Sequence, residues 1–155
     1  LKPDRYVVAY IEQESARRLP GETVAFGVLR GSERMEIKVV LGEEPKLVRE
    51  ADRKYYDRIG VTAREFVYGD AIARRAKTAA PSGVIAHFVK PSSPAAIAGL
   101  RPEDWIQEID GTEVKTFSEA VAKLQAIEAD NARPEFVMLV SRDAGDTAVL
   151  RVKLK

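Results

Sequence analysis

Few side chains of this sequence have the types and spacing that catalysis or metal binding requires. The only histidine, His87, lies inside an apolar, strand-like run, with no serine elbow and no second metal ligand near it along the chain. The adjacent acids Glu43–Glu44 and Glu103–Asp104 fall in predicted loops, Asp143 stands alone, and none of them forms a calcium-type cluster. The absence of cysteine excludes thiolate nucleophiles, thiolate metal sites and disulfides. We therefore expect no catalytic residue, no metal and no cofactor in this chain.

The best-defined local structure begins at Gly83. Residues 84–89 form a short apolar run rich in β-branched and aromatic side chains, which favours a buried strand. Ser93 is suited to cap a short helix, Pro94 to occupy its first position, and Gly99 to end it in a left-handed conformation. The sequence therefore predicts a strand followed by a helix of little more than one turn.

A tight hairpin and a longer helix are predicted next. Residues 105–109 lead into Asp110–Gly111, a pair suited to the positive φ angles of a tight turn, and Trp105 is expected to anchor this hairpin against the core. Thr116 and Glu119 have the spacing of a capping box, in which the side chain of each residue accepts a hydrogen bond from the backbone N–H of the other residue. A helix to about Glu128 follows from this signal.

These segments resemble PDZ domains, specifically the bacterial kind attached to HtrA/Deg-type and related envelope proteases. The residues that carry the resemblance are Ser93-Pro94-Ala95, Ala98-Gly99-Leu100, Asp104 with Ile106, and Ile109-Asp110-Gly111. Glu103 departs from the pattern, because the family has glycine there. If that position requires a positive φ angle, the turn before Asp104 is strained.

The resemblance implies a peptide-binding groove between an early strand and the late helix. The Ile59-Gly60-Val61 segment resembles the carboxylate-binding loop of PDZ domains, and a loop that turns at Gly60 can direct successive N–H groups at one anion, with the positive charge of Arg58 nearby. The predicted carboxylate loop is Arg58, Ile59, Gly60 and Val61; the predicted groove is Thr62, Ala63, Arg64, Phe117, Val121 and Leu124. The last three lie on one helix face, and packing into the core is their alternative role. Many PDZ domains have histidine at the position of Phe117, so we expect a hydrophobic ligand residue there.

Composition limits the partners and the number of domains. Lysine and arginine number 25 against 24 acids, a net charge of +1, so no overall field attracts nucleic acid or a membrane surface. No stretch approaches the roughly 18 apolar residues of a membrane span, and Leu1–Asp4 does not begin a signal peptide. The 155 residues suffice for one good core and part of another. The family resemblance implies an α+β, mostly β fold, a partly open antiparallel barrel capped by two helices, located in the bacterial periplasm or envelope.

An internal repeat predicts the domain organisation. Thr23–Arg30 and Arg34–Leu41 read as two strands after a helix over Tyr6–Arg17. The pattern of residues 24–30 and 37–41 recurs at residues 136–142 and 149–154, with Arg30 and Arg142 separated by 112 positions. We therefore expect residues 1–45 to be the C-terminal half of a first PDZ-like domain and residues 58–155 to be a complete PDZ domain. The polar, charged segment 46–57 is expected to be a helical linker. An incomplete first module leaves strand edges uncovered, so association with another copy is one way of covering them.

Three functions are compatible with the sequence. The first is a non-catalytic PDZ region of an envelope serine protease that binds hydrophobic C-terminal tails or exposed segments by strand addition, and so regulates the protease or delivers substrate in protein quality control. The second is a scaffold or oligomerisation module whose groove is filled by its own chain, for instance by Asp70–Lys77, a predicted short basic helix. The third is the PDZ region of a different peptidase class. An enzymatic activity of this chain itself is disfavoured, because no nucleophile and base can be paired.

Overall fold

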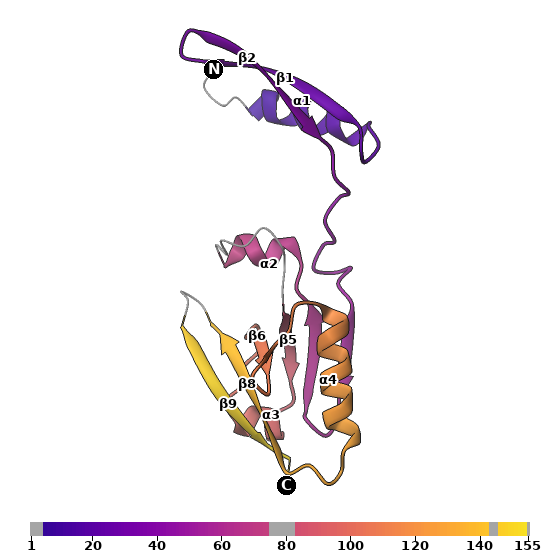
Figure 1. Ribbon diagram of the computed structural model, residues 1–155, viewed down its shortest axis with the longest axis vertical. Helices are drawn as coiled ribbons and strands as arrows, with labels where there is room; N and C mark the ends of the chain where they lie inside the picture. Colours follow the sequence, from indigo (N-terminus) through magenta and orange to yellow (C-terminus); the bar gives the residue numbers. More distant parts are fainter. Residues whose placement is uncertain (1–4, 75–82, 143–145, 155) are drawn as a thin grey trace. The chain divides into compact units, whose positions relative to one another are not determined.

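The computed structural model describes residues 5–74, 83–142 and 146–154 of the chain (Figure 1). It divides into two compact units, unit 1 from Leu1 to Glu44 and unit 2 from Pro45 to Lys155. Unit 1 has a two-stranded sheet and unit 2 a seven-stranded sheet. Among the described residues, no helix is long and apolar enough to cross a membrane.

Unit 1 consists of a helix and a hairpin. α1 spans Arg5–Ala16, β1 spans Thr23–Arg30 and β2 spans Glu33–Val40, which confirms the predicted helix and strands to within one residue at each end. Gly31, at a φ angle of 65°, supplies the left-handed conformation that the tight turn between β1 and β2 requires. Alternate side chains of β1 are half-buried, as expected for a strand with one face covered.

The same order of elements recurs at the end of unit 2. There, α4 (Phe117–Ala129) is followed by β8 (Glu135–Ser141) and β9 (Thr147–Lys153). The helix starts and the first-strand starts of the two sets differ by the same 112 positions (117 − 5 and 135 − 23). Both hairpins are antiparallel. The repeat seen in the sequence therefore has a structural counterpart, while the assignment of unit 1 to half of a PDZ-like domain stays a prediction.

The predicted helical linker over residues 46–57 is wrong. No helix is present in this segment; a turn at residues 48–50 is followed by the strand β3, Arg53–Tyr56, which pairs with β4, Val61–Glu65. The helix prediction relied on charge and overlooked the aromatic pair Tyr55 and Tyr56, which suits a strand and gains from pairing with a neighbour. Unit 2 thus begins at Pro45, before the predicted boundary at residue 58.

Over the described residues, the sheet of unit 2 is antiparallel throughout and does not close into a barrel. Its strand order is β3-β4-β5-β6-β8-β9, so β3 and β9 lie at opposite ends, and β7 pairs with β6 beside this path. The remaining strands are β5 (Val84–Val89), β6 (Trp105–Ile109) and β7 (Thr112–Glu113). The architecture is the mostly-β α+β fold that was predicted, with the barrel left open.

Over its described residues, unit 2 has three helices: α2 (Tyr68–Ala73), α3 (Pro94–Ile97) and α4. α2 replaces the predicted helix over residues 70–77 and begins two residues earlier; residues 75–77 lie outside the described residues. The main core is a single cluster of buried apolar side chains from β3 to β9 and from α3 and α4, among them Ile59, Val84, Ile106 and Leu124. The apolar side chains of the sheet and of these two helices thus form one shared core.

The predictions for residues 83–114 are confirmed in detail. The Ser93 hydroxyl accepts the N–H of Ala96 at 3.2 Å, Pro94 is the first helical residue, and Gly99 follows the helix at a φ angle of 91°. Asp110 and Gly111 both have positive φ angles, 52° and 69°, as a tight hairpin turn requires. In β5, the buried strand that was predicted, His87 and Phe88 are exposed while the other four residues are buried.

The aromatic residue Trp105 and the turn residue Glu103 also behave as the sequence indicates. The ring of Trp105 lies 4.7 Å from that of Phe66, centroid to centroid, so it packs against a neighbouring element. Glu103, which stands where the PDZ pattern has glycine, has a φ angle of 68°, so this turn is strained by about 1 kcal/mol relative to glycine. The N–H of Glu103 donates to the carbonyl of Ala86 at 2.8 Å and holds the turn against β5.

The division into units predicts which fragments fold. Residues 45–155 are expected to unfold in one cooperative transition with denaturant, because they contain the whole seven-stranded sheet and its core. Residues 1–44 alone are expected to show little secondary structure, since a helix and one hairpin of this length bury too little apolar surface. Circular dichroism of both fragments measures this. A well-ordered monomeric 1–44 fragment, or an unfolded 45–155 fragment, would contradict the division.

Candidate functional site

The predicted ligand-binding edge of β4 is occupied by β3. The two strands are antiparallel, with Tyr56 opposite Val61, Tyr55 opposite Thr62 and Lys54 opposite Ala63. The other edge of β4 pairs with β5. The backbone of β4 therefore has a neighbouring strand on each side.

The predicted carboxylate loop directs its backbone N–H groups at oxygen atoms of the chain itself. The N–H of Gly60 donates to the carbonyl of Tyr56 at 2.8 Å, and the φ angle of Gly60 is 80°. The two carboxylate oxygens of Glu128, from α4, accept the N–H groups of Arg58 at 2.8 Å and Ile59 at 3.3 Å. Successive amides of this loop thus bind one carboxylate, which is the chemistry predicted for them, although the carboxylate is internal.

The guanidinium of Arg58 does not face this loop. It donates to the carbonyls of Ile127 at 3.0 Å, Asp130 at 2.6 Å and Arg133 at 2.8 Å, at the end of α4 and in the segment that follows. A helix leaves its last carbonyls without partners, and a planar cation with several donors satisfies them well. The predicted role of Arg58 as a free positive charge beside the anion site is therefore corrected to one of capping the C-terminal end of α4.

Two of the predicted groove residues of α4, Phe117 and Leu124, pack in the core, and the backbone of the third, Val121, contacts β3. Leu124 is fully buried, whereas Phe117 and Val121 are half-buried, and Phe117 packs against the core cluster. The hydroxyl of Tyr56 lies 3.5 Å from the carbonyl of Val121. On β4, Ala63 is fully buried and Thr62 is half-buried. Core packing, the alternative use of this helix face, therefore applies fully to Leu124.

Arg64, a predicted groove residue, lies elsewhere. Its side chain is 1% exposed and forms two hydrogen bonds of 2.8 Å to the two carboxylate oxygens of Asp70, at the start of α2. Asp70 also accepts the N–H of Val67 at 2.9 Å. The groove assignment of Arg64 is thus wrong, because its buried guanidinium gains most from a carboxylate that bonds it on two atoms, and Asp70 provides one.

This buried ion pair has clear electrostatic consequences. Burial alone raises the pKa of Asp70, but the hydrogen bonds from Arg64 and Val67 and the charges of Arg64 and Arg74 outweigh it and hold that pKa below its ordinary value. The hydrogen bond to Asp70 raises the pKa of the Arg64 guanidinium. Both groups are therefore charged at neutral pH.

The residues that sequence reasoning missed are Lys54, Tyr56 and Glu128. Tyr56 is 2% exposed, and burial, followed by the nearby charge of Glu128, raises its pKa to about 12. The Lys54 ammonium donates to the Gln125 side chain of α4 at 2.9 Å. An aromatic pair four residues before a loop glycine was the available signal for a hairpin onto β4.

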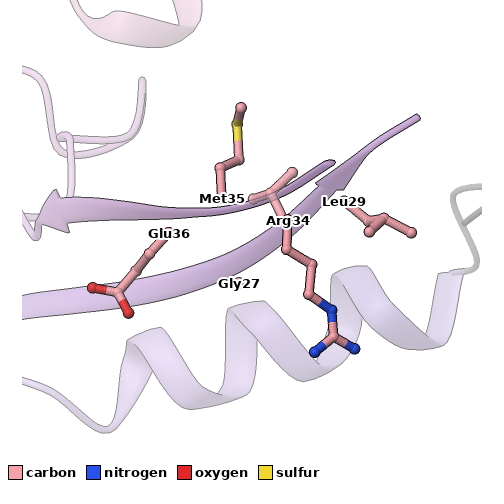
Figure 2. A pocket seen from close by; sticks show the side chains of 6 residues that line it. Gly27, Leu29, Arg34, Met35 and Glu36 are labelled. Carbon is pink, nitrogen blue, oxygen red and sulfur yellow. The ribbon is translucent and has the colours of Figure 1, made fainter. Parts of the chain in front are cut away.

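A hollow of about 550 Å³ lies on the hairpin of unit 1 (Figure 2), where the side chains of Arg34 and Met35 point to opposite sides. It contains none of the predicted site residues, and its lining is Gly27, Val28, Leu29, Arg34, Met35 and Glu36. Within the described part of the chain, no three histidine, aspartate or glutamate side chains gather in a way that would hold a metal ion.

Comparisons with known proteins bear on this geometry. Residues 89–137 match the family model of the PDZ domain. A search of curated proteins finds no significant match. Among solved structures, the HtrA3 PDZ domain bound to a phage-derived ligand (FGRWV) is 19% identical with a TM-score of 0.47, and the alignment covers 66% of this chain and 86% of that chain. Residues 89–137 therefore match the PDZ domain family, and the fold of unit 2 is mostly-β α+β.

Proposed function

We propose that unit 2 is a peptide-binding module that adds a partner's hydrophobic C-terminal tail, or an exposed extended segment, as a strand on β4. The observation that carries this proposal is β3 itself. An extended segment already pairs with this edge in antiparallel register, with an aromatic side chain buried beside α4 and a carbonyl on the Gly60 N–H. A ligand strand would use the same main-chain hydrogen bonds for affinity and the same side-chain pocket for specificity.

The chemistry of the loop supports a free carboxylate at the ligand's end. The N–H groups of Arg58 and Ile59 already bind the Glu128 carboxylate, and the Gly60 N–H binds a carbonyl oxygen. Three successive amides directed at oxygen atoms form the kind of concavity that attracts an anion. A terminal carboxylate would compete with Glu128 and the Tyr56 carbonyl for these donors.

We also propose a cellular context, which rests on the resemblance to HtrA/Deg-type proteins. In this proposal the chain is a non-catalytic regulatory region of a bacterial envelope serine protease, and it presents substrates to the catalytic domain or responds to them. The coding sequence upstream of Leu1 tests this directly. A trypsin-like domain with a Gly-Asn-Ser-Gly-Gly segment is expected, and another catalytic signature would place the chain in a different peptidase class.

Peptide binding is tested with matched ligands and matched variants. Free-acid peptides with a hydrophobic last residue are expected to bind the full chain about tenfold or more tightly than their C-terminal amides, since hydrogen bonds to a charged group contribute about 1.5–3 kcal/mol. Isothermal titration calorimetry measures the ratio. Val121→Glu is expected to abolish binding, because it places a charge at a half-buried position of α4 that is predicted to line the groove.

Ala122→Glu is the control for charge, since Ala122 is the next residue of α4 and is exposed. It is expected to leave binding unchanged. Equal affinities for free-acid and amidated peptides, or peptide contacts mapped by chemical shifts away from both β4 and α4, would contradict the proposed mode.

A second function, a scaffold or oligomerisation module with a self-filled groove, has one observation in its favour. The edge of β4 holds a segment of its own chain, β3, whereas the sequence indicated Asp70–Lys77 for this role. A permanent β3 would leave no peptide affinity at any concentration. The peptide titration therefore separates the two functions.

A further inference from the structure

We propose that β3 is an internal ligand of the peptide site, which leaves the β4 edge when a partner strand binds and which also defines the ligand chemistry. In this inference the site prefers segments that end in an aromatic residue with a basic residue two positions before it, as Lys54 precedes Tyr56. The inference rests on the proposed function, because it concerns the regulation and specificity of the same site.

The direction of β3 is the first argument. β3 runs antiparallel to β4, and its carboxyl end, Tyr56, lies opposite Val61 at the start of β4. A peptide whose terminal carboxylate binds the loop at residues 58–61 has to run in this same direction, because only then does its last residue lie next to Gly60. β3 therefore has the orientation and register of a ligand.

The atoms at the end of β3 are the second argument. The Tyr56 carbonyl accepts the Gly60 N–H at 2.8 Å, so it occupies the position of one oxygen of a terminal carboxylate. The Glu128 carboxylate accepts the next two N–H groups back along the loop, those of Ile59 and Arg58. The Tyr56 carbonyl and the Glu128 carboxylate thus occupy the three loop N–H groups that could bind the free carboxylate of a ligand.

The side chains of β3 are the third argument. Tyr56 is 2% exposed within the main core cluster, and its hydroxyl lies 3.5 Å from the Val121 carbonyl. The Lys54 ammonium bonds Gln125 on the next turn of α4 and lies 6.0 Å from the Tyr56 ring centroid. A pocket already shaped around a phenol with a nearby cation is expected to accept the same pair from a ligand.

The fourth argument is that β3 is suited to exchange. It has four residues and ends the sheet, so releasing it breaks the pairing with one strand only. Tyr55, on the other face of β3, is 45% exposed. Because a ligand binds only the fraction of molecules in which β3 is released, its apparent affinity is reduced by that fraction. Fixing β3 in place should then abolish binding, and weakening β3 should strengthen it.

A reversible covalent bond across β3 and β4 tests this in the full chain. Tyr55 and Thr62 are directly opposite partners, and such pairs have Cα atoms about 4.5–5.5 Å apart, within the range of a disulfide. The chain has no cysteine of its own, so Tyr55→Cys/Thr62→Cys forms one defined disulfide. The probe is a free-acid peptide that ends in Arg-Lys-Tyr-Tyr, the sequence of β3. We expect the reduced protein to bind it at least about tenfold more tightly than the oxidised protein.

The control is the equivalent bond in another part of the sheet. Val137 and Arg151 are directly opposite on β8 and β9. Val137→Cys/Arg151→Cys is expected to bind the probe equally in its oxidised and reduced forms, because its disulfide does not hold β3. Equal affinities of the oxidised and reduced β3–β4 variant would overturn the inference.

The second experiment truncates Tyr56, the buried side chain that holds β3 in place. Tyr56→Ala is expected to bind the probe at least about fivefold more tightly than the unmodified chain, because more molecules have β3 released. Tyr55→Ala, the same truncation on the exposed face, is expected to change affinity by less than about twofold. No gain from Tyr56→Ala in a folded protein would contradict the inference, and the disulfide test decides if this variant does not fold.

The specificity is measured in the reduced β3–β4 variant. A peptide ending in Arg-Lys-Tyr-Tyr is expected to bind more tightly than one ending in Arg-Glu-Tyr-Val, and equal affinities would remove the proposed ligand chemistry. If no peptide binds any form, including the reduced variant and Tyr56→Ala, the proposed peptide-binding function itself is wrong. Peptide binding that is equal in the oxidised and reduced β3–β4 variant would instead keep the proposed function and remove only the control by β3.

Discussion

Replacing Asp70 with alanine is expected to destabilise unit 2 by about 3–5 kcal/mol, the cost typical of leaving one member of a buried ion pair without its partner. The Arg64 guanidinium is 1% exposed and bonds both oxygens of Asp70, so the variant retains a buried cation with few acceptors. The N–H of Val67 also loses its acceptor. Chemical denaturation followed by circular dichroism measures the change in the free energy of unfolding.

Two further variants separate the loss of charge pairing from other effects. Arg64→Met/Asp70→Leu is expected to recover much of the lost stability, because removing both charges leaves no unpaired ion in the interior. Asp52→Ala removes the exposed partner of Lys46, and the denaturation midpoint is expected to change little. If Asp70→Ala is no more destabilising than Asp52→Ala, the Arg64–Asp70 pair does not hold α2 against β4.

The same pair gives a defined pH dependence. The pKa of Asp70 in the folded protein lies below its ordinary value of 3.8, so the carboxylate favours folding. For such a group the contribution is fully present above the unfolded pKa and is lost as pH falls through the folded pKa. The stability difference between the unmodified chain and Asp70→Ala is therefore expected to be constant near neutral pH and to decrease below about pH 4.

Gly60→Ala is expected to destabilise unit 2 by about 3 kcal/mol or more, which combines a backbone cost of about 1–2 kcal/mol with the cost of overpacking. Gly60 has a φ angle of 80°, and an added Cβ would lie 2.5 Å from the Ser93 hydroxyl oxygen and closer still to its Cβ. The carbonyl of Gly60 also accepts the N–H of Lys90 at 2.9 Å, so the loop has little room to shift. Thermal or chemical denaturation measures the loss.

Two matched variants divide this cost into its parts. Gly111→Ala has a similar φ angle of 69° with nothing within 4 Å of the added Cβ, so it is expected to show the backbone cost alone. Gly60→Ala/Ser93→Gly removes the clash, and because glycine is tolerated as an N-cap, it is expected to recover more than about 1 kcal/mol. If Gly60→Ala costs no more than Gly111→Ala, the loop does not pack against Ser93 as the structure has it.

The sequence by itself determined those parts of the protein whose signals are local. Ser93, Pro94 and Gly99 fix the limits of α3 through capping, and Asp110–Gly111 fixes the hairpin after β6, because each acts on backbone angles and donors within a few residues. The capping box of Thr116 and Glu119 likewise places the start of α4. From these elements the PDZ resemblance and the α+β class follow.

Only the tertiary structure decided what lies beside β4. The aromatic pair Tyr55 and Tyr56 could indicate a strand, but the partners of a strand are set by the fold, so the segment 46–57 did not show that Tyr56 would be buried beside α4. The partners of three charged groups also depended on how the elements pack. Arg58 bonds carbonyls about 70 residues later, Glu128 of α4 accepts N–H groups of the loop, and Arg64 of β4 bonds Asp70 of α2. The residue types of the site could be read along the chain. That β3 lies on the edge of β4 and Glu128 on the loop could not, because these contacts form only when β3, β4 and α4 come together.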